Sequence, residues 1–300
     1  MTEKYILQVN GKNYTFDQRT WIMGVINVTP DSFSDGGLYF EKDKAVERGL
    51  ELAEEGSDII DIGGESTRPG SEPIPQEEEL RRVIPVISAL RKRTNTLISI
   101  DTTKSEVALA ALDAGADIIN DISSFRSDPN MLPVAAQKDA PVILMHMKGT
   151  PKTMQVNPFY ENVLHEVKSF LKERLNSALA YGIKKEKIII DPGIGFGKRF
   201  KDNLTLINHL HFLKDLDRPI LVGISRKSFI GKILGLSPQE RMEGTIASAV
   251  LSIVRGAHIL RVHDVASIKK SVLVAETILN EDQLPGSLGN SREKKSSYVC

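Results

Sequence analysis

The chain has 300 residues, of which 41% are hydrophobic and 26% charged, enough to bury one large core or two modest ones. Lys plus Arg and Asp plus Glu both number 39, which argues against attraction to nucleic acid or an anionic membrane. No apolar run approaches the roughly 20 residues of a membrane span, and the start MTEKYILQVN lacks the apolar core of a signal peptide. We therefore expect a cytoplasmic protein. The single cysteine, Cys300, excludes an intrachain disulfide and a thiolate metal cluster, and we interpret it as incidental.

Residues 1–20 contain the first predicted element. The stretch YILQVNGKNYTF includes Asn10-Gly11, a dipeptide that favours the tight turn of a β-hairpin. The hairpin precedes a single main domain, which we assign to residues 21–282. The remaining residues, 283–300, have no periodicity and are predicted to form a disordered tail.

The main domain repeats one pattern: a short Ile/Val-rich run, a polar or Gly-rich break, and a longer amphipathic segment. Each repeat predicts a strand followed by a helix. The apolar runs lie at residues 21–28, 58–63, 96–101, 117–121, 142–147, 187–191, 220–225 and 258–264. Eight such units fit a (β/α)8 TIM barrel of the α/β class, whereas a doubly wound sheet usually has fewer strands. The hairpin would then cover the barrel bottom.

Polar residues follow almost every predicted strand, at the end where barrels of this type carry their chemistry. They are Asn27 and Thr29, Asp61, Asp101, Asn120 and Asp121, His146, Asp191, Ser225 with Arg226 and Lys227, and Arg261 with His263. Such residues also cap the next helix, and for Asp61, Asp121 and Ser225 both interpretations stay open. Asp101 and Asp191 close strongly apolar runs, which favours a functional role for these two.

The last predicted strand carries Arg261 and His263, which are two apart and project from one face. Its neighbours in a closed barrel bring Asn27 and the SRKS stretch at 225–228 alongside. This corner indicates a site for a polyanion, and pyrophosphate fits it better than a lone carboxylate. The alternative is that Arg226 and Lys227 lie on the solvated start of a helix.

Two strand-to-helix connections are longer than is usual in such units. The first, TPDSFSDGGLYFEKD, carries Phe33 and Asp35, and the second, GESTRPGSEPIPQ, carries Thr67 and Arg68. We interpret both as lids that order over a ligand, with plain solvent loops as the alternative.

Motifs for several other mechanisms are missing. The sequence has no HExxH, no GxSxG and no GxxxxGK[ST], which argues against a protein-caged metal, a serine nucleophile and a phosphate loop. The stretch IDPGIGFGKR at 190–199 is rich in glycine, but its GxGxG spacing is not the GxGxxG of a dinucleotide site. We expect its glycines to let the backbone and Phe196 approach a flat substrate.

The ordered set VINVTPDSFSDGG, DIGGESTRPG, ISIDTTK, IINDISS, MHMKGTP, DPGIGFGK, GISRKSFIG and RVHDV resembles the dihydropteroate synthases of folate biosynthesis. The resemblance runs from about residue 20 to 270 and implies a (β/α)8 barrel. It implies a transferase that joins 6-hydroxymethyl-7,8-dihydropterin pyrophosphate to p-aminobenzoate with Mg2+. It also implies sulfonamide binding and a homodimer formed through barrel helices.

The resemblance implies roles for individual residues. The pterin site would contain Asp101, Asn120, Met145, Asp191, Phe196 and Lys227; the pyrophosphate site Asn27, Thr67, Arg68, Arg261 and His263; the p-aminobenzoate site Phe33, Pro69, Phe196, Lys227 and Ser228. Asn27 would also bind the metal, and Asp101, Lys227, Asp35 and Arg68 would act in catalysis. Two alternatives remain: a pterin-binding methyltransferase acting on methyltetrahydrofolate, and a catalytically silent pterin-binding paralogue.

Overall fold

The computed structural model describes residues 5–16, 19–29 and 38–283 of the chain. Eight parallel strands within this part form a sheet in the order β8-β7-β6-β5-β4-β3-β10-β9. The strands are β3 Trp21–Asn27, β4 Ile59–Gly63, β5 Leu97–Asp101, β6 Ile118–Asp121, β7 Val142–Met145, β8 Ile188–Asp191, β9 Leu221–Gly223 and β10 Ile259–Val262. A parallel bridge between Ile190 and Ile220 joins the two ends of the sheet, so it closes into the predicted barrel.

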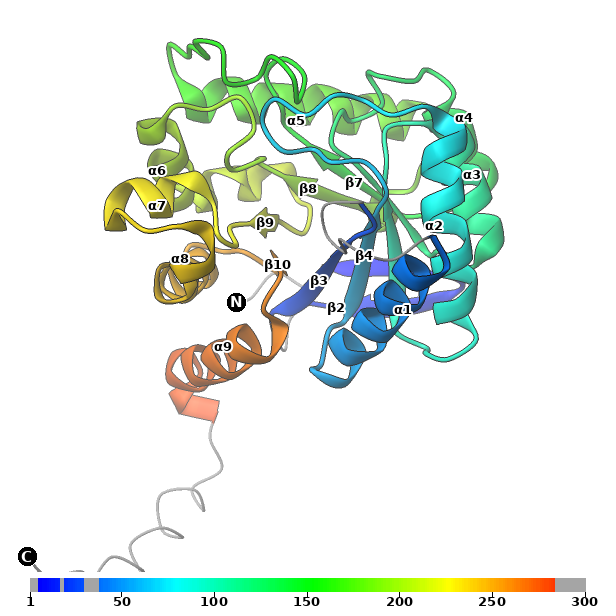
Figure 1. The fold of residues 1–300 in the computed structure, drawn as a ribbon. Coiled ribbons are helices and arrows are strands. Elements are labelled where there is room, and N and C mark those ends of the chain that lie inside the picture. Colours follow the sequence, from blue (N-terminus) through cyan, green and yellow to red (C-terminus); the bar gives the residue numbers. More distant parts are fainter. Residues whose placement is uncertain (1–4, 17–18, 30–37, 284–300) are drawn as a thin grey trace, which may run out of the picture.

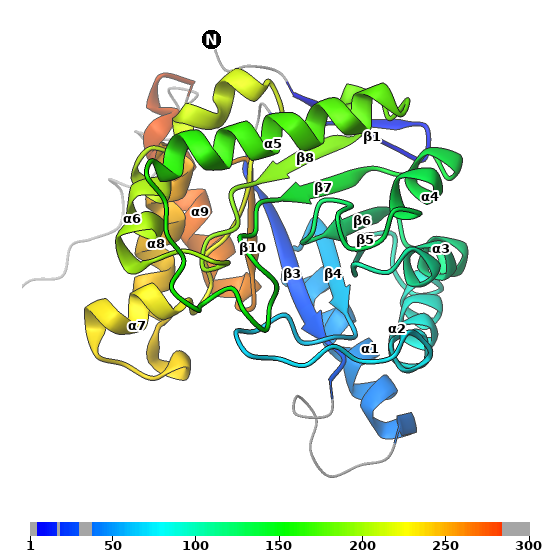
Figure 2. The same cartoon turned by 90° about the horizontal axis from the view of Figure 1, so that it is seen from above.

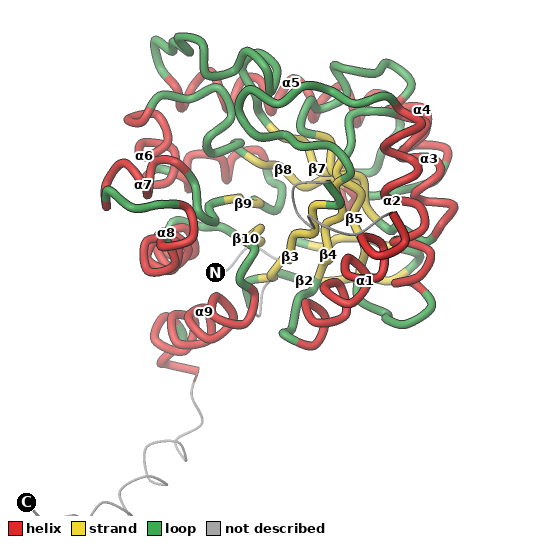
Figure 3. Tube along the Cα trace, in the orientation of Figure 1, coloured by secondary structure: helices red, strands yellow, loops and turns green. Residues whose placement is uncertain are grey.

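Helices surround this sheet on its outer side (Figures 1 and 2). Those described are α1 Leu38–Glu54, α2 Gln76–Arg91, α3 Ser105–Ala114, α4 Met131–Gln137, α5 Val163–Ala180, α6 Phe200–Asn208, α7 Ser228–Leu234, α8 Met242–Val254 and α9 Val265–Leu279. Figure 3 shows strands at the centre, helices outside and loops between them. Each strand lies within two residues of its predicted bounds, and the (β/α)8 fold class is confirmed.

Two large hydrophobic clusters form the core of the barrel. The larger one lies between the outward faces of the strands and the helices, and it includes Ile60, Ile98 and Leu144. Because both faces of these strands are covered, their runs are apolar at nearly every position.

The second cluster closes the barrel bottom, as the sequence predicts. The hairpin β1 Ile6–Val9 and β2 Lys12–Thr15 turns at Asn10 and Gly11, both with positive φ. Its buried residues Tyr5, Leu7 and Val9 belong to one cluster with residues near the amino ends of the barrel strands. These strand residues are Trp21, Met23, Ile59, Leu97, Ile118, Ile143, Ile189, Leu221 and Ile259.

Candidate active site at the carboxyl ends of the strands

An arginine joins two carboxylates inside the barrel mouth. Arg261 on β10 donates from Nε to Oδ2 of Asp61 at 2.6 Å and from Nη2 to Oδ2 of Asp101 at 2.7 Å. Asn120, at the end of β6, donates to the same Asp61 carboxylate at 3.2 Å. Asp61 is thus part of the site and does not serve as a helix cap, which decides between the two interpretations that the sequence left open.

Asp101 keeps one carboxylate oxygen without a partner. Its Oδ1 atom is buried and makes no hydrogen bond in the described part of the chain. Burial raises the pKa of Asp101 to about 7, against the opposing effect of Arg261. Such an orphaned acceptor is costly unless a ligand satisfies it, so Asp101 is prepared to receive a donor or a positive charge.

Asp191 and Lys227 lie on the neighbouring side of the mouth. Asp191 is 5% exposed and accepts from the backbone N–H of Gly193 at 2.6 Å. Burial raises its pKa to about 6. Lys227, the residue before α7, has a pKa lowered to about 8 by burial and by Arg261. Its Nζ lies 4.3 Å from the centre of the Phe196 ring, a cation–π geometry.

An apolar platform accompanies these polar groups. It consists of Ile122, Met145, Met147, Met154 and Phe196, which form a cluster of their own. Flat heterocycles pack well against methionine and aromatic side chains. The sequence pointed to Met145 and Phe196; Ile122 and Met147 were missed, although each lies within two residues of a strand end.

His263 does not contribute a positive charge near neutral pH. Its Nδ1 atom lies 3.0 Å from Oγ of Ser225, and burial, with Arg261 second, lowers its pKa to about 4. Arg226 donates from Nε and Nη2 to the two carboxylate oxygens of Asp264, at 2.9 and 2.5 Å. Of the four potential cations expected in this corner, Arg226 and Arg261 are paired with carboxylates, Lys227 lies over the Phe196 ring, and His263 is a neutral imidazole.

The connection of residues 64–75, the β4–α2 loop, is described in full. Thr67 is half-buried, whereas Arg68 and Pro69 are exposed. The loop contacts the β7–α5 connection of residues 146–162, where the N–H of Gly70 donates to the carbonyl of Pro151 at 3.0 Å. Of the other predicted loop residues, Ser228 is exposed at the start of α7, and Phe33 and Asp35 lie outside the described residues.

A cavity of about 450 Å³ opens between these loops. Thr67 and Asp101 line it, together with Ile122, Arg126 and Thr150. Asp191, Lys227 and Phe196 do not, so the predicted site residues extend beyond this cavity, across the centre of the mouth. The structure thus brings together Asp61, Asp101, Asn120 and Arg261 by hydrogen bonds, and Lys227 with Phe196 by ring contact.

Asn27 ends β3 and is the one candidate metal ligand from the sequence. Its side chain is half-buried and makes no hydrogen bond to another described residue. Among the described residues, no group of three or more His, Cys, Asp or Glu could hold a metal. A free amide oxygen fits Mg2+, which commonly takes one or two protein ligands and completes its shell with substrate phosphates and water.

Two of the glycines in 190–199 are required by close packing within the protein, while the expected approach of this stretch to a flat substrate stays a prediction. A Cβ atom on Gly193 would lie 2.0 Å from the carbonyl oxygen of His146, and one on Gly197 2.2 Å from that of Lys148. Both residues have positive φ, which glycine adopts without strain. They allow the loop to pack against the chain after β7. Two of the glycines also approach site residues: an added Cβ would lie 3.2 Å from the Met145 side chain at Gly193 and 3.2 Å from the Lys227 side chain at Gly195.

Two further strand-end residues have structural roles. The Asp121 carboxylate accepts from the N–H groups of Ser123 and Phe125, both at 2.7 Å, so it caps its own turn. His146 is buried and touches Lys198, a residue that the sequence did not single out.

Comparisons with known proteins agree with this geometry. The family model "Pterin binding enzyme" matches residues 23–263. The chain is 48% identical to the dihydropteroate synthase of Synechocystis sp. over 91% of this chain and 94% of the relative. The structure of Xanthomonas albilineans dihydropteroate synthase with 4-aminobenzoic acid has a TM-score of 0.87 and 46% identity, covering 94% of this chain and 100% of that one. The Yersinia pestis synthase in a sulfonamide complex has a TM-score of 0.86 and 42% identity, covering 91% and 99%. The chain belongs to the pterin-binding enzymes, and within them to the dihydropteroate synthases.

Proposed function

We propose that the mouth of this barrel joins 6-hydroxymethyl-7,8-dihydropterin pyrophosphate to p-aminobenzoate, giving 7,8-dihydropteroate and pyrophosphate. Membership of the dihydropteroate synthases supports the reaction. The observation that carries the assignment of residues is the orphaned Oδ1 of Asp101. This residue is the strand neighbour of Asn120, accepts from Arg261 through Oδ2, and lines one cavity with Ile122 and Met147 of the apolar platform. A buried acceptor beside apolar surface suits a ring that presents N–H groups at its edge.

The ring is held by Asp191, Asn120 and Lys227 in this proposal. A pterin has adjacent N–H donors on its amino-pyrimidinone edge, and a carboxylate can accept two of them at once. Asp191 is the carboxylate for that edge because it is buried and has one backbone donor already in place. Lys227 donates to the ring carbonyl, while Met145 and Phe196 pack on the ring faces.

The pyrophosphate is held by Arg261, Thr67, Arg68, Asn27 and His263. Arg261 donates to Asp61 and Asp101, so a diphosphate would compete with two carboxylates for its donors. His263 acts as a neutral hydrogen-bond donor, because its lowered pKa leaves it uncharged at neutral pH.

Mg2+ is the expected cofactor, and the amide oxygen of Asn27, which has no hydrogen-bond partner among the described residues, is the protein ligand that we propose for it. When bound, the ion neutralises charge on the leaving pyrophosphate. Asn27 orients the diphosphate toward Arg261, since β3 and β10 are neighbours in the sheet.

The reaction needs no enzymic nucleophile. The bond between the exocyclic methylene carbon and the bridging oxygen breaks, and its electron pair leaves with pyrophosphate. The amine nitrogen of p-aminobenzoate then forms the new C–N bond and loses a proton. Asp101 stabilises the positive charge that develops on the pterin, because its carboxylate is buried at the mouth and the residue lines the cavity there.

The amine enters through a subsite completed by the two long loops. Pro69, Ser228, Phe196 and Lys227 are its described members, and Phe33 of the first loop is expected to join them. Because sulfonamides resemble p-aminobenzoate, and a similar synthase was solved with one, we expect them to bind here.

A homodimer is part of the proposal. Helices α6, α7 and α8 enclose an apolar groove of about 590 Å³ lined by Leu204, Ile233, Leu234 and Leu251, all substantially exposed. A monomer seldom exposes so continuous an apolar face, and a second copy presenting the same face would cover it.

The expected cytoplasmic location stays a prediction; no described helix is both long and apolar enough to span a bilayer.

Measuring pyrophosphate release with and without p-aminobenzoate tests the function. We expect release from dihydropterin pyrophosphate to depend on p-aminobenzoate and to match the formation of dihydropteroate one to one. Absence of release with both substrates and Mg2+ present would support the silent pterin-binding alternative.

A further inference from the structure

Lys198 is a buried lysine with no part in the proposed chemistry. It is 2% exposed, and lysine side chains are seldom buried to this degree. Its Nζ atom meets Nδ1 of His146 at 3.0 Å, the carbonyl oxygen of His146 at 3.2 Å and the carbonyl oxygen of Phe196 at 3.0 Å. An ammonium group has three N–H bonds, so all three are used when His146 carries its proton on Nε2.

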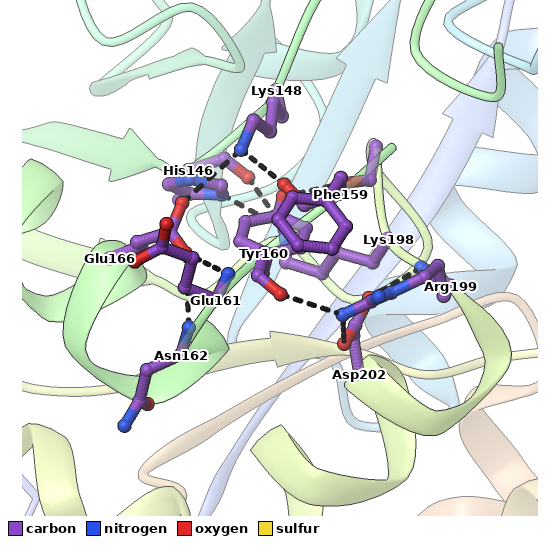
Figure 4. A network of polar contacts seen from close by, with 11 residues as sticks. His146, Lys148, Phe159, Tyr160, Glu161, Asn162, Glu166, Lys198, Arg199 and Asp202 are labelled. Atoms are coloured by element: carbon purple, nitrogen blue, oxygen red, sulfur yellow. Dashed lines mark hydrogen bonds and ion pairs between the residues drawn. The ribbon is translucent and has the colours of Figure 1, made fainter. Parts of the chain in front are cut away.

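These acceptors belong to two different connections. His146 directly follows β7, whereas Phe196 lies in the β8–α6 loop of residues 192–199. Figure 4 shows Lys198 with its partner His146 and with Tyr160 in one network of polar contacts. Tyr160 adds a second link, because its hydroxyl donates to the carbonyl of Gly197 at 2.6 Å. Arg199 adds a third by donating to the carbonyl of Tyr160 at 3.0 Å.

The β8–α6 loop is bordered by site residues. Asp191 precedes it, and the N–H of His146 donates to the Asp191 carbonyl at 2.9 Å. Phe196 presents its ring to Lys227 from the middle of the loop. A shift of the loop would therefore move the pterin edge contact and one face of the apolar platform together.

The charge of Lys198 acts on the same site. Burial lowers the pKa of Lys198 to about 7, while Asp191 raises it. The charged groups that face Asp191 are Lys198, Lys227 from the start of α7 and Arg261 from β10. All three favour the ionised carboxylate against the effect of burial, so removing Lys198 would raise the pKa of Asp191.

We infer that Lys198, hydrogen-bonded to His146, is a positioning residue that fixes the β8–α6 loop and so aligns Asp191 and Phe196 with the pterin ring. The inference rests on the proposed pterin site. If the inference holds, loss of Lys198 raises KM for dihydropterin pyrophosphate more than KM for p-aminobenzoate. A merely structural role of Lys198 would change both KM values alike.

The test compares Lys198→Met with Lys201→Met, a matched control at an exposed position on α6. Methionine keeps most of the volume and removes the donors and the charge. For each variant, KM is measured for dihydropterin pyrophosphate and for p-aminobenzoate, with the pH dependence of dihydropteroate binding. Circular dichroism establishes that the variants are folded.

We expect Lys198→Met to raise KM for dihydropterin pyrophosphate tenfold or more. KM for p-aminobenzoate should rise by a smaller factor, because Phe196 alone of the two aligned residues belongs to both subsites. The acid midpoint for dihydropteroate binding should move to higher pH than in the wild-type protein. Lys201→Met should leave all three values unchanged. A pterin KM and a midpoint equal to those of the control would overturn the inference.

Two further variants make every outcome decisive. If Lys198→Met does not fold, Lys198→Gln replaces it, and failure of both to fold means that Lys198 is structural and the inference is wrong. Asp191→Asn tests the pterin site itself. If Asp191→Asn loses pterin binding and Lys198→Met keeps it, only the role of Lys198 is refuted. If Asp191→Asn binds pterin as the wild-type protein does, the proposed site is refuted.

Discussion

Arg261 shows how single side chains at the barrel mouth depend on one another. It holds Asp61 and Asp101 at once, and Asp61 in turn accepts from Asn120. Removing one member leaves the others buried with unmatched charge or unmatched hydrogen bonds. Effects of substitutions within this group should therefore not be additive.

Asp101→Asn keeps the size of the side chain and removes its charge, so it should nearly abolish turnover while the protein stays folded. Lys227→Ala should do the same by removing the donor to the pterin carbonyl. We expect kcat/KM to fall by about a hundredfold or more, the range seen when a transition-state contact is lost. Steady-state kinetics beside unfolding curves measure this, and activity within a few fold of wild type would refute the roles of these residues.

The pKa of Asp191 predicts how pterin binding depends on pH. Burial raises this pKa to about 6, and only the ionised carboxylate accepts two N–H bonds from the ring. The affinity for dihydropteroate should therefore fall as pH drops through 6, approaching tenfold per unit below it, in addition to the effects of Asp101 and Lys227, whose pKa values are about 7 and about 8. Calorimetric titration at pH values between about 4.5 and 8, a range that brackets the Asp191 pKa of about 6, measures this affinity. In Asp191→Asn this acid limb should be absent, and its persistence would assign it to another group.

The β8–α6 loop shows how an element depends on close backbone approach. Gly193→Ala would place a Cβ atom 2.0 Å from the His146 carbonyl oxygen, in addition to adopting positive φ. Gly182→Ala is the matched control, because Gly182 has φ +103° and no atom within 4 Å of the added Cβ. The control should cost about 1–2 kcal/mol of unfolding free energy from the backbone alone. Gly193→Ala should cost clearly more in urea denaturation; equal costs would mean that the close approach relaxes freely.

The β4–α2 loop is expected to act as a lid, and Arg68 is one of its exposed residues. Arg68→Ala should chiefly weaken closure, raising KM for p-aminobenzoate more than KM for dihydropterin pyrophosphate. Steady-state kinetics with each substrate varied in turn measures both. A rise confined to KM for dihydropterin pyrophosphate would indicate that Arg68 binds the pyrophosphate without affecting closure.

At the scale of the whole molecule, the groove of α6, α7 and α8 predicts a dimer. Wild-type protein should sediment as a dimer of the 33.2 kDa chain. Leu251→Glu, in the groove, should shift it to monomer. Leu273→Glu on α9 is the control, because Leu273 is also exposed but does not line the groove. A monomeric wild type, or a dimer that survives Leu251→Glu, would contradict this interface.

The order of strands and the position of most site residues could be predicted because each barrel strand is a short apolar run with a polar residue at its end. Pairings between distant residues could not. Arg261 contacts Asp61 and Asp101 across 200 and 160 residues, and no local pattern specifies which carboxylates share one guanidinium. Lys198 was missed because a lysine in a loop is normally solvated, and its burial depends on how two connections pack.

The central claim is that the pterin ring lies among Asp101, Asn120, Asp191 and Lys227. A crystal structure with 7,8-dihydropteroate tests it most directly. We predict the Asp191 carboxylate within hydrogen-bond distance of the amino-pyrimidinone edge, with the ring packed on Phe196. A ring bound instead in the cavity between Thr67, Arg126 and Thr150, away from Asp191 and Lys227, would contradict the account.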